Sequence, residues 1–157
     1  MTTQTATKQK TSAVIQGLQT LLADSYALMA QTHLAHWNVE GPGFFQLHKA
    51  FQRQYEELFT AIDDVAERLR ALDVLAPGGL KTLAKSSRLE EMAVGTAPAK
   101  DFVAHLIDSH EILVGNAHAL REAAGGSGDL ETQDLVIGRL RAHEKTLWML
   151  KSFLKNL

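Results

Sequence analysis

Apolar residues recur at spacings of three and four along most of this chain, which is the period of an α-helix with one buried face. Between Lys10 and Trp37 this stripe contains Val14, Leu18, Leu21, Leu22, Ser25, Leu28, Met29 and Thr32. After Gly43 a second stripe contains Leu47, Phe51, Tyr55, Leu58, Ile62, Ala66, Leu69 and Leu72, and it ends near Asp73. The two stripes predict two long helices that are separated by Gly41-Pro42-Gly43, where proline and glycine interrupt the helical pattern.

The second half of the chain repeats this pattern. Pro98 can begin a third helix, with Thr96 as its cap, and the apolar stripe then runs through Phe102, Leu106, Ser109, Leu113 and Leu120 to the glycine-rich residues 125–128. Asp129 is a suitable cap for a fourth helix, whose stripe contains Leu135, Ile137, Leu140, Leu147, Leu150 and Leu154. No stretch alternates apolar and polar residues as a strand does.

The connection between the second and third helices is long, covering residues 74–97, and its sequence LKTLAKSS is compatible with a short helix. Four helices of about 25 residues each would be roughly 35–40 Å long and could pack side by side. The sequence therefore predicts an all-α fold, a four-helix bundle with a short extra helix in one crossover connection.

Composition narrows the class of protein further. With 157 residues, 45% of them hydrophobic, the chain fits one domain over residues 10–157, preceded by a flexible polar tail over residues 1–9. The formal net charge is −2, so the whole chain is not a polycation. The N-terminus has no secretory pattern, and no apolar stretch approaches the ~20 residues that cross a bilayer, so we expect a cytoplasmic protein that does not contact membranes.

The absence of cysteine excludes disulfides, thiolate metal sites and thiol catalysis, and leaves seven histidines and the carboxylates as metal ligands. No Glu is followed three residues later by a His, so the Glu-x-x-His pairs of many di-iron bundles are absent. The zinc-protease pattern also fails, because Val114 and Leu147 stand where a second His would follow His110 and His143.

Four residues around the first helix reversal could bind a metal. His36 and His48 flank the glycine-proline reversal, and Asp63 and Glu67 lie one helical turn apart on the second helix. Fifteen residues of straight helix separate His48 from Asp63 by about 22 Å, so one chain cannot bring both pairs to one ion. One interpretation is that the histidines only cap or pack the helices and the carboxylates form a solvated face. The other is that the histidines of one subunit meet the carboxylates of another across a twofold axis, which would give mixed sites suited to Fe(II).

The segment AHWNVEGPGFFQLHKAFQRQYEELFTAIDDVAERLRAL resembles the signature of the Dps-type miniferritins, which are ferritin-like, dodecameric iron-storage proteins. The resemblance extends from TLLADSYALMAQTHLAHWNV to HEKTLWMLKSFL and so covers most of the chain. It implies a homododecamer whose intersubunit ferroxidase sites consist of His36, His48, Asp63 and Glu67 and hold up to two irons each. These sites would oxidise Fe(II), preferably with hydrogen peroxide although oxygen is also an oxidant, and the shell would store the Fe(III) mineral and protect DNA from oxidative damage.

One position departs from the family pattern. An acidic residue generally stands one turn after the second His, and here that residue is Gln52. A neutral amide is a weak ligand, so Gln52 is expected to serve as an outer ligand at most and to weaken the second iron position. This departure keeps an alternative open, a structural or DNA-condensing shell with weak or no ferroxidase activity. A metal-free helical binding module is a third hypothesis, which would make the motif match a coincidence.

Other residues have two interpretations each. Trp37 is either a redox-active aromatic beside the site or a packing residue at a subunit contact, and His33 is a surface or supporting residue rather than a ligand. The acidic residues Asp129, Glu131 and Asp134 either line a pore through which iron enters, as in the family, or complement the dipole at a helix start.

Contact with DNA is a separate question. Basic residues occur near both termini, and these are Lys8, Lys10, Arg139, Arg141, Lys145, Lys151 and Lys155. Because each chain carries a net charge of −2, the body of a dodecamer would repel phosphate, and non-specific DNA binding would depend on many tails acting together. If DNA is bound, the protein would lie in the bacterial nucleoid.

Overall fold

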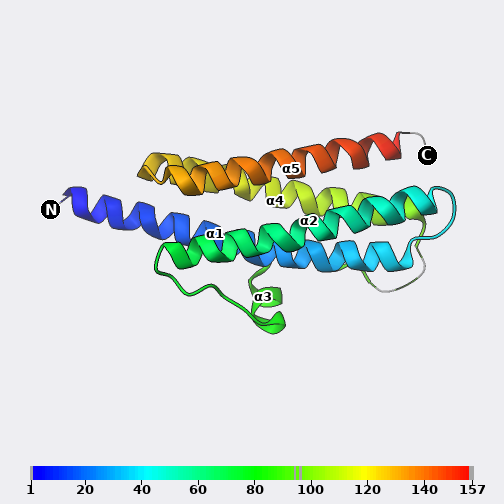
Figure 1. Cartoon of the computed structure of the whole chain (residues 1–157), viewed down its shortest axis with the longest axis horizontal. Coiled ribbons are helices and arrows are strands. Elements are labelled where there is room, and N and C mark those ends of the chain that lie inside the picture. The colour runs from blue at the N-terminus through cyan, green and yellow to red at the C-terminus, as the bar shows by residue number, and fades with distance from the viewer. Residues whose placement is uncertain (1, 94, 96, 156–157) are drawn as a thin grey trace.

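The computed structural model describes residues 2–93, 95 and 97–155, with side chains described from residue 12 onward. Four long helices run roughly alongside one another (Figure 1): α1 (Thr2–Asn38), α2 (Phe44–Ala71), α4 (Ala99–Ser127) and α5 (Leu130–Leu154). The short helix α3 (Leu80–Ser86) lies in the connection between α2 and α4. No strand occurs in the part of the chain that the structure describes, which confirms the predicted all-α bundle with one extra short helix.

The starts of α1 and α4 can be compared with the predicted helix starts. The first helix begins at Thr2, earlier than the predicted start at Lys10, so the backbone of the predicted tail continues α1. The side chains of Lys8 and Lys10 lie outside the described residues, and the flexibility of residues 1–9 stays a prediction. Thr96, the predicted cap of the third helix, also lies outside the described residues, and Pro98 occupies the position before Ala99.

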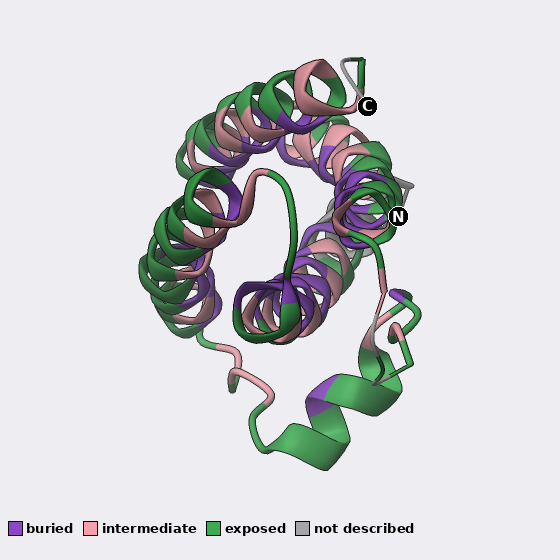
Figure 2. Cartoon of the chain, turned by 90° about the vertical axis from the view of Figure 1, so that its right-hand side faces the viewer, coloured by how far each residue is buried: buried purple, intermediate pink, exposed green. Residues whose placement is uncertain are grey.

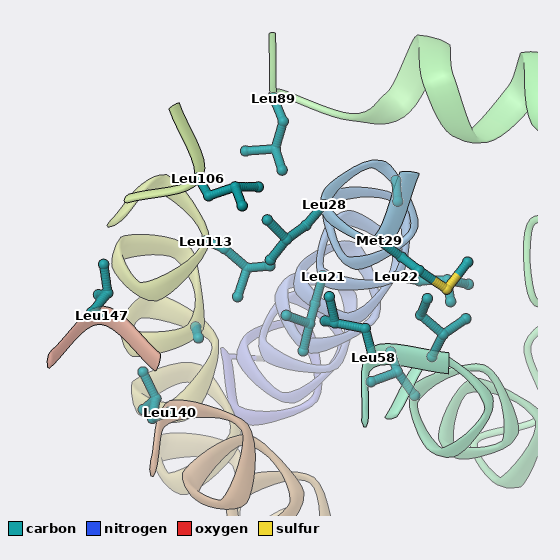
Figure 3. Close-up of a cluster of buried hydrophobic side chains, with 14 of the residues drawn as sticks. Leu21, Leu22, Leu28, Met29, Leu58, Leu89, Leu106, Leu113, Leu140 and Leu147 are labelled. Carbon is teal, nitrogen blue, oxygen red and sulfur yellow. The ribbon is translucent and has the colours of Figure 1, made fainter. Parts of the chain in front are cut away.

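The predicted apolar stripes form one core, except that on α5 Val136 is buried in it in place of the predicted Ile137. Leu18 and Leu28 of α1, Phe51 of α2, Leu106 of α4 and Leu150 of α5 are all buried. Figure 2 shows the buried part of each ribbon turned inward, and Figure 3 shows leucines from all four long helices converging. Burial of this apolar surface provides most of the free energy that holds the helices together.

The long connection is fixed to the bundle by one buried carboxylate. Asp24 of α1 is fully buried, and its oxygens accept hydrogen bonds from the Ser87 hydroxyl and the backbone N–H of Arg88 at 3.1 and 2.8 Å. The guanidinium of Arg88 also pairs with Asp24 at 2.8 Å. Since α3 packs against α1 and α4 packs against α1 as well, the chain crosses the bundle between α2 and α4, as predicted.

In the described part of the chain, none of the helices combines the length and apolarity that crossing a bilayer requires.

Candidate metal centre

The reversal between α1 and α2 brings two histidines together. Gly41 and Gly43 adopt φ angles of 83° and 82°, the left-handed region that glycine reaches without strain. This turn places the last residues of α1 directly against the first turns of α2. The rings of His36 and His48 stack with their centroids 3.8 Å apart.

Reciprocal hydrogen bonds fix both histidine rings. The Nδ1–H of His36 donates to the backbone carbonyl of His48 at 2.8 Å, and the Nδ1–H of His48 donates to the carbonyl of His36 at 2.9 Å. A neutral imidazole that donates through Nδ1 has its lone pair on Nε2. Both rings therefore hold the tautomer that binds a metal through Nε2, with the second nitrogen oriented by the backbone.

Aromatic rings surround this histidine pair. Phe44 stacks on His48 with a centroid distance of 5.1 Å, and Tyr55 meets His36 edge-on at 5.2 Å. Tyr55 also contacts His33 at 4.2 Å. Partial burial, followed by the electrostatic interaction with His36, lowers the pKa of His33, so this ring is neutral near pH 7. The sequence pattern did not point to Tyr55 or Phe44 as parts of the site, although Tyr55 follows His48 by seven residues and therefore lies on the same side of α2.

The predicted carboxylates lie elsewhere on the same chain. Asp63 and Glu67 are exposed on α2, one turn apart. Because α2 is continuous from Phe44 to Ala71, the separation of about 22 Å between His48 and Asp63 stands. No group of three or more His, Asp and Glu able to hold a metal occurs among the described side chains. The structure joins His36 to His48 but does not bring either to the carboxylates.

One exposed face of α2 carries residues from both the histidine pair and the carboxylate pair. Gln52, Phe59, Asp63 and Glu67 follow one another on it at spacings of one or two helical turns, with His48 at its beginning. Phe59 is 71% exposed, an unusual position for a phenylalanine in the middle of a helix. The amide of Gln52 donates to Glu56 at 2.8 Å, and its side-chain oxygen makes no hydrogen bond with the residues that the structure describes.

The three acidic residues of the predicted pore differ in their surroundings. Asp129 caps α5, accepting from the backbone N–H of Thr132 at 3.0 Å, and it pairs with Arg68 at 2.7 Å. Burial alone would raise the pKa of Asp129, but the Thr132 hydrogen bonds and the Arg68 charge together lower it. Glu131 and Asp134 are exposed near the start of α5. Asp129 therefore has the capping role that the sequence indicated, and the pore stays a prediction.

Two further predictions concern one exposed residue, Trp37, and one buried residue, Arg139. Trp37 is 70% exposed, and its ring stacks on His33 with a centroid distance of 5.2 Å. The prediction that Arg139 is a basic residue available to DNA is wrong. It is buried, and its guanidinium pairs with Glu57 and His143 inside the bundle.

Comparison with known proteins agrees with this geometry. Residues 15–157 match the ferritin-like domain family. The DNA protection during starvation protein 2 of Bacillus anthracis is 35% identical over 143 residues, which cover 91% of this chain and 97% of that protein. This chain is a Dps-type miniferritin.

Other relatives extend the match. An uncharacterized low temperature-induced protein of Nostoc is 37% identical to this miniferritin, covering 96% of this chain and 84% of the relative. The X-ray structure of Dps from Thermosynechococcus elongatus superposes with a TM-score of 0.90 at 30% identity, covering 95% of this chain and 94% of that one. The Dps protein of Vibrio cholerae, described as a member of a broad superfamily of ferritin-like diiron-carboxylate proteins, has a TM-score of 0.87 at 29% identity, covering 93% and 91%.

Proposed function

We propose that this miniferritin oxidises Fe(II) at sites shared between subunits and stores the Fe(III) mineral inside a dodecameric shell. The observation that carries the proposal is the division of one ligand set along α2. His36 at the end of α1 and His48 of α2 form a preorganised pair of nitrogen ligands, while Asp63 and Glu67 are exposed on α2 about 22 Å from His48. Neither half binds a metal strongly alone, so a second copy must complete the site.

A twofold axis would bring the halves together. The midpoint between His48 and Asp63 falls at Tyr55 and Glu56, so two antiparallel copies of α2 that cross there would place each histidine pair opposite the partner's carboxylates. The exposed Phe59 lies one turn from this midpoint, and burying it in the contact would favour dimerisation. A dimer then has two identical sites, and a dodecamer has twelve.

The donor set suits iron as a substrate. Two imidazole nitrogens and two carboxylates combine borderline and hard ligands, and the carboxylate charge favours the product Fe(III) over Fe(II). Two Fe(II) ions each lose one electron and hydrogen peroxide accepts both, so its O–O bond breaks, and hydrolysis of the Fe(III) releases protons. Asp63 and Glu67 provide the anionic ligands, while His36 and His48 fix the position of the first iron.

Trp37 is assigned a supporting role in this proposal. Ring contacts run from Trp37 to His33, from His33 to Tyr55 and from Tyr55 to His36. A one-electron oxidant formed near His36 could therefore take an electron from Trp37 through these rings. Trp37 would then spare other groups from oxidation, which is the first of the two interpretations that the sequence leaves open.

Protection of DNA follows from the same chemistry. Removing Fe(II) and peroxide together prevents hydroxyl-radical formation and requires no contact with DNA. Several relatives are named DNA protection during starvation proteins, which supports this role. Direct DNA binding through the terminal lysines stays a separate prediction, and it loses the contribution of Arg139.

Mixing variants tests the shared site. His48→Ala subunits and Asp63→Ala subunits should each assemble into shells of about 206 kDa, twelve times 17.2 kDa, that oxidise Fe(II) slowly. Shells reassembled from both should regain activity, because one site in each mixed dimer has all four ligands. Asp108→Ala, at an exposed position on α4, is the control and should retain full activity. No recovery on mixing, or a stable monomer at micromolar concentration, would refute the shared site.

A further inference from the structure

A cavity of about 630 Å³ lies between α2 and α5, apart from the histidine pair at the reversal. Its walls include Ala50 and Leu58 of α2 and Ala142 and Met149 of α5. Its polar lining includes His110 of α4 and His143 of α5, with Lys49, Arg53 and Lys145 also around it. The site proposed for iron uses none of these residues.

The two histidines belong to a buried chain of hydrogen bonds. Both are at most 2% exposed, and their Nδ1 atoms are 2.9 Å apart. The guanidinium of Arg139 lies 3.2 Å from Nε2 of His143, and it also pairs with Glu57. The chain therefore runs from the half-exposed Glu57 through Arg139 and His143 to His110.

Arg139 determines which atom donates in each hydrogen bond between Arg139 and His110. A guanidinium can only donate, so Nε2 of His143 must be the acceptor. A neutral His143 then carries its proton on Nδ1 and donates it to Nδ1 of His110, which leaves the proton of His110 on Nε2. Burial, and then the charge of Arg139, lowers the pKa of His110 to about 4, so this ring is neutral near pH 7.

The last donor of this hydrogen-bond chain, the Nε2–H of His110, has no acceptor among the described residues. Nε2 of His110 is buried and makes no hydrogen bond with any described residue, and the same holds for the side-chain oxygen of Gln54, which also lines the cavity. An unpaired buried N–H is costly, and such groups in native proteins normally have a partner. The cavity thus contains a donor that requires an acceptor atom.

Charge and size indicate the chemistry of that acceptor. Lys49, Arg53 and Lys145 are exposed and form no ion pair with the described residues, whereas the carboxylate of Glu57 is already paired with Arg139. A cation is disfavoured among Lys49, Arg53 and Lys145. The walls are largely apolar, and the volume of about 630 Å³ exceeds what an inorganic ion fills. The complementary molecule carries an anionic oxygen on a short apolar body.

We propose that this cavity binds a small organic anion, whose oxygen accepts the Nε2–H of His110 while Lys49, Arg53 and Lys145 provide the opposite charge and Ala142 and Met149 contact the apolar body. The site is independent of the iron chemistry. Its test therefore uses the assembled protein without added iron, and failure of one proposal leaves the other intact.

Hexanoate is the probe, and calorimetric titration at low ionic strength measures its binding. We expect one saturable site per chain. Hexanol, which lacks the charge, and inorganic phosphate, which lacks the apolar body, should bind at least about tenfold more weakly. Arg53→Gln should weaken hexanoate binding by about two- to fivefold, the usual contribution of one exposed charge. Arg70→Gln on the same helix lies outside the cavity and should leave the affinity unchanged.

A crystal structure of the shell with hexanoate completes the test. A carboxylate oxygen within hydrogen-bond distance of Nε2 of His110 would confirm the assignment. Three results would overturn it: no saturable binding, equal affinity for hexanol, or a neighbouring subunit of the shell that fills the cavity. Equal weakening by Arg53→Gln and Arg70→Gln would also overturn it, because it would indicate a general charge effect.

Discussion

The buried histidines make the fold sensitive to acid. Burial comes first among the causes that lower the pKa of both His110 and His143, and the charge of Arg139 adds to it. A group whose pKa is lower in the folded state takes up its proton more readily in the unfolded state. The stabilisation is therefore fully present above the unfolded pKa of 6.5 and is lost as the pH falls below it.

The magnitude follows from the difference in pKa. For His110 the folded pKa is about 4 against an unfolded value of 6.5. At about 1.4 kcal/mol for each pKa unit, this histidine alone would cost the folded state roughly 3 kcal/mol between pH 6.5 and pH 4. The pKa of His143 is also well below 6.5, so its contribution extends the loss to lower pH.

Urea unfolding, repeated across this pH range, measures the effect. The protein concentration is held constant, because assembly contributes to stability. The substitution His110→Gln keeps an amide oxygen that can accept from His143 but removes one titrating ring. The slope of unfolding free energy against pH should fall by up to about 1.4 kcal/mol per pH unit between pH 6 and pH 5. His118→Gln, at a half-exposed position on the same helix, serves as the control.

Equal slopes for the parent and the His110→Gln protein would refute this reasoning, because they would mean that His110 titrates alike in the folded and unfolded states. Proton uptake on unfolding, measured at pH 5.5, provides a second readout that does not depend on the absolute stability of the variant. It should be smaller in the His110→Gln protein by close to one proton per chain.

Two further predictions concern the ligand position at Gln52 and the ion pair between Glu57 and Arg139. Gln52→Glu restores a charged group one turn after His48 and should tighten binding of a second Fe(II) and speed peroxide-driven oxidation, measured by anaerobic titration and absorbance; unchanged stoichiometry and rate would contradict the assignment of a weakened ligand position. Glu57→Gln should destabilise the protein by about 1–2 kcal/mol in urea unfolding, more than Arg139→Met does, because it leaves a buried guanidinium uncompensated whereas Arg139→Met removes that charge. The reverse order would show that the hydrogen bond from Arg139 to His143 outweighs the buried charge.

Much of the molecule follows from local patterns in the sequence. The stripe from Val14 to Thr32 predicted the buried face of α1, and glycines at 41 and 43 predicted the reversal, because both depend on residues close together in the chain. The role of Asp129 as the cap of α5 could be predicted from the sequence for the same reason. The motif around His36 and His48 also predicted the family. These features need only the helical period and the conformational preferences of single residues.

Long-range pairing required the tertiary structure. The positions of His110 between Leu106 and Leu113, and of His143 between Leu140 and Leu147, indicate burial of each, but no spacing reveals that the two rings share a proton 33 residues apart. Arg139 looked like an exposed base because charge patterns cannot show that Glu57, 82 residues away, lies beside it. Packing of α2, α4 and α5 decides these contacts, since the cost of burying a charge depends on neighbours that only the folded chain brings together.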